Sequence, residues 1–194
     1  MSEEQQQIQY DTICLVYHDE INVEKVKALM EVCSNAVNQY GVKTLYFQFS
    51  SNGGSVDSAI TLYNFLRSLP CEIVMHNIGS IDSSAIVVFM AGTKRYAVAH
   101  TSFHFHGVGW GISEGTYSLD KIEEFKSGIE SAEEKTANIV AEHTSLSVSE
   151  IKDFYKQGQS KSASFAKSKG VVSALKDVEL PADTPILTVN SSTR

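Results

Sequence analysis

The sequence predicts an α/β fold in which helices cover a largely parallel β-sheet. Short runs of alternating apolar and polar residues, typical of strands, take turns with longer runs whose apolar residues recur every three or four positions. Strands that alternate with helices in this way indicate parallel pairing with helices on the faces of the sheet. With 194 residues and 42% hydrophobic content, the chain can bury one core and need not form two domains.

The first part of the chain contains five predicted elements. In order, they are a strand at 13–17, a helix at 23–40, a strand at 45–49, a helix at 57–68 and a strand at 72–76. Leu45, Phe47 and Phe49 alternate with their neighbours as in a strand. Gly41 is suited to the left-handed cap that ends the first helix, and Pro70 stops the second.

The second part is predicted to contain two short strands, at 94–98 and 102–106, and one long helix at 118–143. Apolar residues such as Ile122 and Ile129 form a stripe on this helix, and charged residues such as Glu133 are expected to face water. A long apolar stripe on a helix that projects from a small domain needs a partner surface, so we expect oligomerisation through it. The alternative is that the helix folds back onto its own domain.

Residues 79–92 place two serines at the start of a predicted buried helix. A glycine and small polar residues precede Ser83 and Ser84, and an apolar run from 85 to 91 follows. A helix N-terminus leaves backbone N–H groups unpaired and carries a partial positive charge, so it can stabilise an oxyanion beside a serine hydroxyl. Either a serine here is a nucleophile, or Asp82 or one of the serines simply caps the helix.

A glycine turn follows the strand at 45–49. Gly53 and Gly54 allow the backbone to adopt positive φ and to approach a ligand without a Cβ in the way. Placed between a strand and a helix, such a turn can direct backbone N–H donors at a substrate carbonyl. An ordinary tight connection between strand and helix would have the same pattern.

Two histidines share one face of the strand at 102–106. His104 and His106 are two residues apart and therefore project to the same side. One of them could be the general base that removes the proton of Ser83. The pair could instead bind zinc, but zinc needs a third protein ligand, and no nearby Asp or Glu has a telling spacing. We therefore expect no metal site.

Together these segments resemble the motifs of the Clp protease proteolytic subunit, a family of the ClpP/crotonase superfamily. The segments 52–56, 79–92 and 95–106 match in order and spacing, and the likeness covers roughly residues 13–175. The resemblance implies an α/β spiral of ββα units with a protruding "handle" helix, here about 118–143. We accordingly divide the chain into a polar N-terminal segment, a ClpP-like domain and an extended C-terminal tail, at 1–12, 13–177 and 178–194.

The resemblance also implies a role for each candidate residue. Ser83 takes the position of the nucleophile and His106 that of the general base, whereas Gly53, Gly54 and the N–H of Ser84 take the oxyanion hole. These roles imply a serine endopeptidase that hydrolyses extended peptides or unfolded proteins by acyl transfer, without a cofactor. They also imply a homo-oligomer, and ring formation is expected.

The triad acid is missing from its expected position. It should fall between 151 and 163, where an ungapped match places Gly158. A carboxylate there would orient the base histidine and stabilise its charged form. Other residues that could orient the imidazole are Asp153, Gln157, Gln159 and, beside the proposed nucleophile, Asp82. The alternatives are a hydrolase with a rewired third residue and a catalytically weak or inactive assembly subunit.

Two further segments differ from the family. His106 is followed by Gly107-Val108 rather than by glutamine and proline. The glycine-rich stretch 107–115 corresponds to a strand that pairs with extended peptide substrates in the family, and Trp110 is a candidate pocket wall. The polar segment before Ile13 is shorter than the one with which the family engages its ATPase. A Clp-type ATPase stays open as a partner, although this short segment argues against docking.

Composition restricts the remaining partners. The formal net charge of −7 and the pI near 5.3 argue against nucleic acids and anionic membranes. No apolar run reaches the length of a membrane span, and the polar start lacks a signal-peptide pattern, so a cytoplasmic protein is expected. Cys14, Cys33 and Cys71 lie among apolar neighbours and are expected to be reduced and buried.

Two other enzyme classes compete with the peptidase. A crotonase-like acyl-CoA enzyme would share the oxyanion hole, but it has no need for Ser83 and His106, and the sequence contains no evident adenine-binding signature. A zinc hydrolase would use His104 and His106 as ligands. We favour the peptidase over both.

Overall fold

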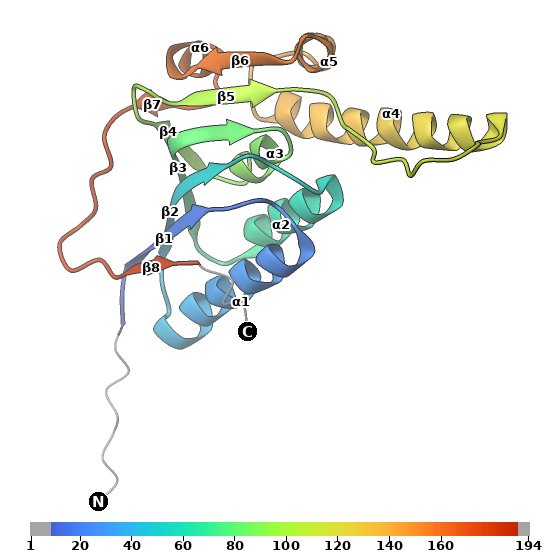
Figure 1. Ribbon diagram of the computed structural model, residues 1–194. Helices are drawn as coiled ribbons and strands as arrows, with labels where there is room; N and C mark the ends of the chain where they lie inside the picture. Colours follow the sequence, from blue (N-terminus) through green and yellow to red (C-terminus); the bar gives the residue numbers. More distant parts are fainter. Residues whose placement is uncertain (1–8, 190–194) are drawn as a thin grey trace, which may run out of the picture.

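Strands and helices alternate along the chain in the predicted order (Figure 1). The structure, a computed structural model, describes residues 9–189. Its strands are β1 (Thr12–His18), β2 (Thr44–Ser51), β3 (Glu72–Asp82), β4 (Lys94–Ala97), β5 (Ser102–Phe105), β6 (Gln159–Ser162), β7 (Ala174–Leu175) and β8 (Ile186–Thr188). Its helices are α1 (Val23–Tyr40), α2 (Val56–Ser68), α3 (Ala85–Phe89), α4 (Leu119–Glu142), α5 (Val148–Gln157) and α6 (Ala163–Ser168).

Within the described residues, the strands form one eight-stranded sheet. Its main path has the order β6-β5-β3-β2-β1-β8, and β4 pairs with β3 and β7 beside this path. The strand pairs are parallel, except that β5 and β6 run antiparallel. The sheet is therefore largely parallel, as the alternation of elements predicts.

The main core lies between the sheet and the helices α1, α2 and α3. Leu45, Phe47 and Phe49 of β2 are buried in it, because alternate residues of a strand face the same side. A smaller apolar cluster occupies the opposite face, where Tyr46 packs with its neighbours on β1 and β3 and with residues 178 and 180 of the chain that crosses this face. Both faces of the central strands are thus covered.

Two predicted boundaries differ in the structure. The strand predicted at 72–76 continues to Asp82, so residues 79–82 belong to β3 and not to a turn. Residues 80–82 pair with β5, which satisfies their backbone groups in the sheet ladder. The predicted tail supplies β8, which pairs in parallel with β1. Residues 1–8 of the predicted N-terminal segment and 190–194 of the tail lie outside the described residues.

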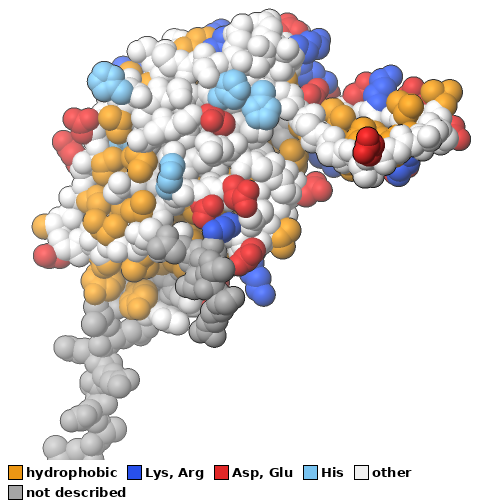
Figure 2. All heavy atoms as spheres, viewed as in Figure 1, with side chains coloured by type: hydrophobic (Ala, Val, Ile, Leu, Met, Phe, Trp, Pro, Cys, Tyr) orange, Lys and Arg blue, Asp and Glu red, His pale blue; other side chains and the backbone are white. Residues whose placement is uncertain are grey.

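Helix α4 projects from the body of the protein and is accompanied by the segment that precedes it (Figure 1). Its buried residues, Thr136, Ala137 and Val140, all lie in its C-terminal half. At its N-terminal half, the side chains of Leu119 and Ile122 are 73% and 51% exposed. The space-filling view shows hydrophobic side chains on the surface of this projection (Figure 2). Helix α4 therefore has the shape of the expected handle.

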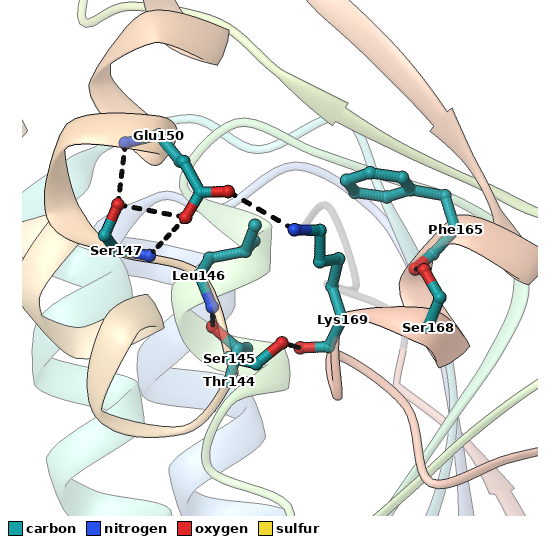
Figure 3. A network of polar contacts seen from close by, with 8 residues as sticks. All are labelled: Thr144, Ser145, Leu146, Ser147, Glu150, Phe165, Ser168 and Lys169. Atoms are coloured by element: carbon teal, nitrogen blue, oxygen red, sulfur yellow. Dashed lines mark hydrogen bonds and ion pairs between the residues drawn. The ribbon is translucent and has the colours of Figure 1, made fainter.

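A polar network joins the start of α5 to the end of α6 (Figure 3). Ser147 and Glu150 form a capping box, in which each side chain accepts from the backbone N–H of the other residue. Lys169 contributes its ammonium group to Glu150, at 3.2 Å, and its carbonyl to the N–H of Ser145, at 2.9 Å. The network thereby connects the start of α5 to the end of α6 and to the turn at Ser145.

The guanidinium of Arg95 ties the ends of several helices together. It donates to the carbonyls of Gly92, His143, Gly170 and Val171, at distances between 2.8 and 3.1 Å. These carbonyls follow α3, α4 and α6, so one side chain satisfies groups that helix ends leave without partners.

In the part of the chain that the structure describes, no helix has both the length and the apolar character that a membrane span requires.

Candidate active site

Ser83 lies in a sharp turn between β3 and α3. Its φ of 56° falls in the left-handed region, which residues with side chains rarely adopt and which is found at strained functional sites. Its N–H donates to the carbonyl of His104 at 2.9 Å, so β5 helps to hold the turn. Ser84 precedes α3, but no side-chain hydrogen bond caps this helix, so helix capping does not explain the two serines.

The glycine turn packs directly against Ser83. A Cβ on Gly53, whose φ is 85°, would lie 2.7 Å from the Cβ of Ser83 and 2.6 Å from the carbonyl oxygen of Asp82. The hydroxyl of Ser84 donates to the carbonyl of Gly54 at 3.1 Å. Only glycine at position 53 allows this contact between the two segments.

The backbone donors of the turn are not equivalent. The N–H of Gly53 donates to the hydroxyl of Ser51 at 3.1 Å. Within the described residues, the N–H groups of Gly54 and Ser84 donate to no protein acceptor. Gly53 therefore allows the close approach, whereas Gly54 and Ser84 carry the donors that are available to a ligand.

His106 follows β5 directly and is exposed. Its Nδ1 lies 2.8 Å from the carbonyl oxygen of Gly107. Because a carbonyl oxygen can only accept, Nδ1 carries the proton, and Nε2 of the neutral ring is left as an acceptor. This is the tautomer that a general base needs when its Nε2 faces a serine hydroxyl.

Ser83 and His106 line the same cavity, which has a volume of about 580 Å³. One side of it consists of the glycine turn and the start of α2, and the other of Trp110 and residues 128–135 of α4. The ring of Trp110 packs on Gly128, where a Cβ would lie 2.8 Å from a ring carbon. Trp110 is thus a wall of the cavity, as predicted from the sequence.

Tyr155 and Thr136 lie beside the two candidate residues, at a small cavity that Ser83 and His106 also line. The hydroxyl of Tyr155 donates to Oγ1 of Thr136 at 3.1 Å. Burial raises the pKa of Tyr155 to about 12. The phenol therefore stays protonated at neutral pH and does not compete with His106 as a base.

Gly158 lies between the end of α5 and the start of β6. β5 and β6 pair antiparallel as far as Phe105 and Gln159, so Gly158 and His106 each lie one residue beyond the last pair. Gly158 ends α5 with a φ of 57°, and an added Cβ would meet nothing within 4 Å. Position 158 is therefore open and uncharged.

The other residues considered for orienting His106 have different partners. Asp153 pairs with Lys156 at 3.7 Å. Gln157 and Gln159 bond to each other, and Asp82 accepts from the hydroxyl of Ser80. Among the described residues, none of these four side chains has a hydrogen bond to His106.

His104 lies beside His106, with 5.3 Å between the ring centroids. Its Nδ1 is 2.9 Å from the hydroxyl of Ser160. In the part of the chain that is described, no group of three His, Cys, Asp or Glu side chains could hold a metal ion.

The three cysteines are free thiols, and burial raises the pKa of each.

Glu133 of α4 was expected to face water, but it is half-buried beside His106. Its Oε1 accepts from the N–H of Val108 at 3.2 Å. The spacing of four residues from Ile129 and of three from Thr136 places it at the edge of the inward stripe of the helix. The spacing was the signal in the sequence that Glu133 is partly buried. We expected it to face water because its side chain is charged.

The segment expected to form a substrate-pairing strand contains none. Residues 107–117 have no helix or strand in the structure. A strand needs a partner for its backbone groups. Four glycines and Ser113 in this stretch further weaken any intrinsic preference for a strand. The segment instead runs along α4 (Figure 1).

Comparison with known proteins identifies the family. The family model described as Clp protease matches residues 4–178. The chain belongs to the Clp protease family. Its fold is accordingly the ClpP/crotonase-like α/β fold, and membership in the Clp protease family supports a ClpP-like serine peptidase.

Members of the Clp protease family with similar sequences come from several bacteria. The ATP-dependent Clp protease proteolytic subunit 1 of Chlamydia felis is 31% identical over 137 residues, which cover 67% of this chain and 66% of that protein. Subunit 2 of Chlamydia trachomatis serovar D is 29% identical over 144 residues, covering 71% and 69%. An Asn-to-Asp mutant of ClpP1 from Listeria monocytogenes has the same fold, with a TM-score of 0.74 at 19% identity over 87% of this chain and 92% of that one.

Proposed function

We propose that this protein is a serine endopeptidase that hydrolyses amide bonds in extended peptides or unfolded proteins. The observation that carries the proposal is the shared cavity of Ser83 and His106, in which the serine occupies a strained turn and the histidine has its Nδ1 proton committed to a carbonyl. Family membership supports the same reaction class.

In the proposed reaction, Oγ of Ser83 attacks the scissile carbonyl carbon while its proton passes to Nε2 of His106. The carbonyl oxygen becomes an oxyanion, which the N–H groups of Gly54 and Ser84 stabilise. His106 then gives the proton to the leaving amine, and an acyl ester remains on Ser83. Water hydrolyses this ester by the same sequence of proton transfers.

The proposed working form is a homo-oligomeric ring in which α4 mediates contacts between copies. The exposed apolar residues of its N-terminal half, together with a shallow apolar hollow beside Phe125, supply a surface that a second copy would cover. The relatives in Chlamydia are named ATP-dependent proteolytic subunits. We carry over the peptidase reaction and leave energy coupling to an ATPase out of the proposal.

A second candidate function is a catalytically weak or inactive assembly subunit. Gly158 favours it, because the expected position of the triad acid holds no carboxylate. A histidine without an orienting charge is a poorer base, and loss of that charge can lower the rate by several orders of magnitude.

Labelling with a fluorophosphonate probe separates the two functions. We expect the wild-type protein to be labelled and the Ser83→Ala and His106→Ala variants to remain unlabelled while keeping the wild-type circular dichroism spectrum. Folded wild-type protein that is not labelled at any pH between 6 and 9 would favour the inactive subunit. Labelling that persists in Ser83→Ala would remove Ser83 from the mechanism.

A further inference from the structure

The peptide unit between Gly107 and Val108 lies between His106 and a carboxylate. Its carbonyl oxygen accepts from Nδ1 of His106 at 2.8 Å. Its N–H donates to Oε1 of Glu133 at 3.2 Å. One planar amide therefore links the imidazole to the carboxylate by two hydrogen bonds in series.

An amide placed in this way transmits charge by polarisation. A carboxylate on the N–H side increases the negative charge on the carbonyl oxygen, since hydrogen bonds in a chain strengthen one another. A more negative oxygen in turn stabilises the proton on Nδ1, and most strongly when the ring becomes an imidazolium. The effect has the same sign as that of a carboxylate bonded directly to Nδ1.

We propose that Glu133 is a positioning residue that replaces the missing triad acid and acts on His106 through the Gly107–Val108 peptide. This inference rests on the proposed function, because it assigns Glu133 a part in the basicity of His106. Glu133 touches neither the serine nor the substrate site. Gly158, at the expected position of that acid, has no charge with which to do the same work.

The peptide unit is held in place from both sides. The N–H of Gly107 donates to the carbonyl of Tyr155 at 3.1 Å. A Cβ at position 107 would lie 2.7 Å from Oε1 of Glu133, so glycine there is what lets the carboxylate approach the backbone. Val108 supplies the N–H, which a proline could not.

Other titratable groups around His106 do not offer an equivalent contact. His104 stands next to it on β5, and Asp57 of α2 and Lys135 of α4 line the same cavity. Among the described residues, Glu133 is the carboxylate that hydrogen bonds connect to the imidazole. A change in the pH dependence of Ser83 reactivity on substitution of Glu133 therefore reports this contact.

The test measures the rate of fluorophosphonate labelling against pH. Glu133→Gln keeps an oxygen that can accept from Val108 but removes the charge. We expect labelling to slow about fivefold, the difference between a charged and a neutral hydrogen-bond acceptor, and the acid limb of the profile to move to lower pH. The matched control is Glu142→Gln, also on α4 and exposed but outside the apolar hollow beside Phe125, which should leave rate and limb unchanged.

An acid limb that does not move in Glu133→Gln would overturn the proposal, even if the overall rate fell, because loss of structure lowers the rate without changing basicity.

If wild-type protein is not labelled at all, the proposed function fails, and nitrogen NMR of His106 tests the inference alone. We then expect the ring of Glu133→Gln to protonate at lower pH than the wild-type ring. Equal titrations would overturn the inference.

Discussion

Gly158 combines an open surface position with a backbone conformation that few residues tolerate. Its φ of 57° belongs to the left-handed region, where Asn and Asp are the side chains most readily accepted. Gly158 and His106 each lie one residue beyond the last pair of β6 with β5. A Cβ at position 158 would meet nothing within 4 Å, so a carboxylate can be introduced here to test whether it reaches the imidazole.

We predict that Gly158→Asp raises the rate of fluorophosphonate labelling of Ser83 by about tenfold or more, because a directly placed carboxylate stabilises the imidazolium. Gly158→Asn is the matched control, since it adopts the same backbone conformation and adds no charge. The gain should be larger when Glu133→Gln is also present, since the indirect charge is then missing. Equal rates for the Asp and Asn variants would show that the position does not reach His106.

Ser83 and His106 were predicted from the sequence to meet, with their roles implied by the resemblance to the family, and both line one cavity. The left-handed turn at Ser83 was not predicted, because a serine carries no sign of a conformation that its neighbours impose. The hydrogen bond of Glu133 to the N–H of Val108 was also missed, because its charge led us to expect it in water although its spacing places it at the edge of the inward stripe of α4.

At the scale of elements, the capping box of α5 is connected to the end of α6. Ser147 and Glu150 begin the helix, and Lys169 connects Glu150 to the end of α6 (Figure 3). Hydrogen bonds from the backbone N–H and the hydroxyl of Ser147, together with Lys169, lower the pKa of Glu150. A carboxyl whose pKa is lower in the folded state stabilises that state at neutral pH.

We predict that Ser147→Ala lowers the free energy of unfolding by about 1 kcal/mol at pH 7, the usual loss for an N-cap. The contribution of Glu150 is present above its unfolded-state pKa of about 4.3 and is lost as the pH falls through the lower folded-state value. The difference between variant and wild type should therefore shrink in acid. Urea denaturation at pH 7 and below pH 4 measures both values. Ser127→Ala, at an exposed position of α4 away from this network, is the control, and a difference independent of pH would exclude the carboxylate.

Element boundaries followed the sequence where local signals were strong. Gly41 ends α1 with a φ of 60°, as expected for a left-handed cap. Where tertiary contacts decided, prediction was less accurate: residues 79–82 extend β3 because β5 lies beside them. In residues 107–117 the expected strand is absent, since in a single chain the segment finds no strand with which to pair.

At the scale of the whole molecule, α4 divides into a buried and an exposed half. Thr136, Ala137 and Val140 anchor the helix to the body, whereas Leu119 and Ile122 remain exposed near its start. The length of the helix was predicted from the sequence, but the sequence does not indicate which half of the helix is buried within one chain. That depends on how far the body extends along the helix.

We predict that Ile122→Glu dissociates the proposed oligomer and leaves the monomer folded, because the new charge would be buried in the contact between copies. Sedimentation velocity measures the mass, and circular dichroism checks the fold. Ser127→Glu adds the same charge at another exposed position of α4 and should keep the wild-type mass. An Ile122→Glu variant that sediments like the wild type would remove this part of α4 from the interface.

The pairing of β8 with β1 has a consequence for biosynthesis. Residues 14–16 of β1 pair with 186–188 of β8, so the two partners are separated by almost the whole chain. A ribosome delivers β1 first, and this edge of the sheet stays unpaired until β8 has emerged. An open strand edge invites pairing with other chains. The interval between the synthesis of β1 and that of β8 is therefore the period in which this edge of the nascent protein is exposed to aggregation.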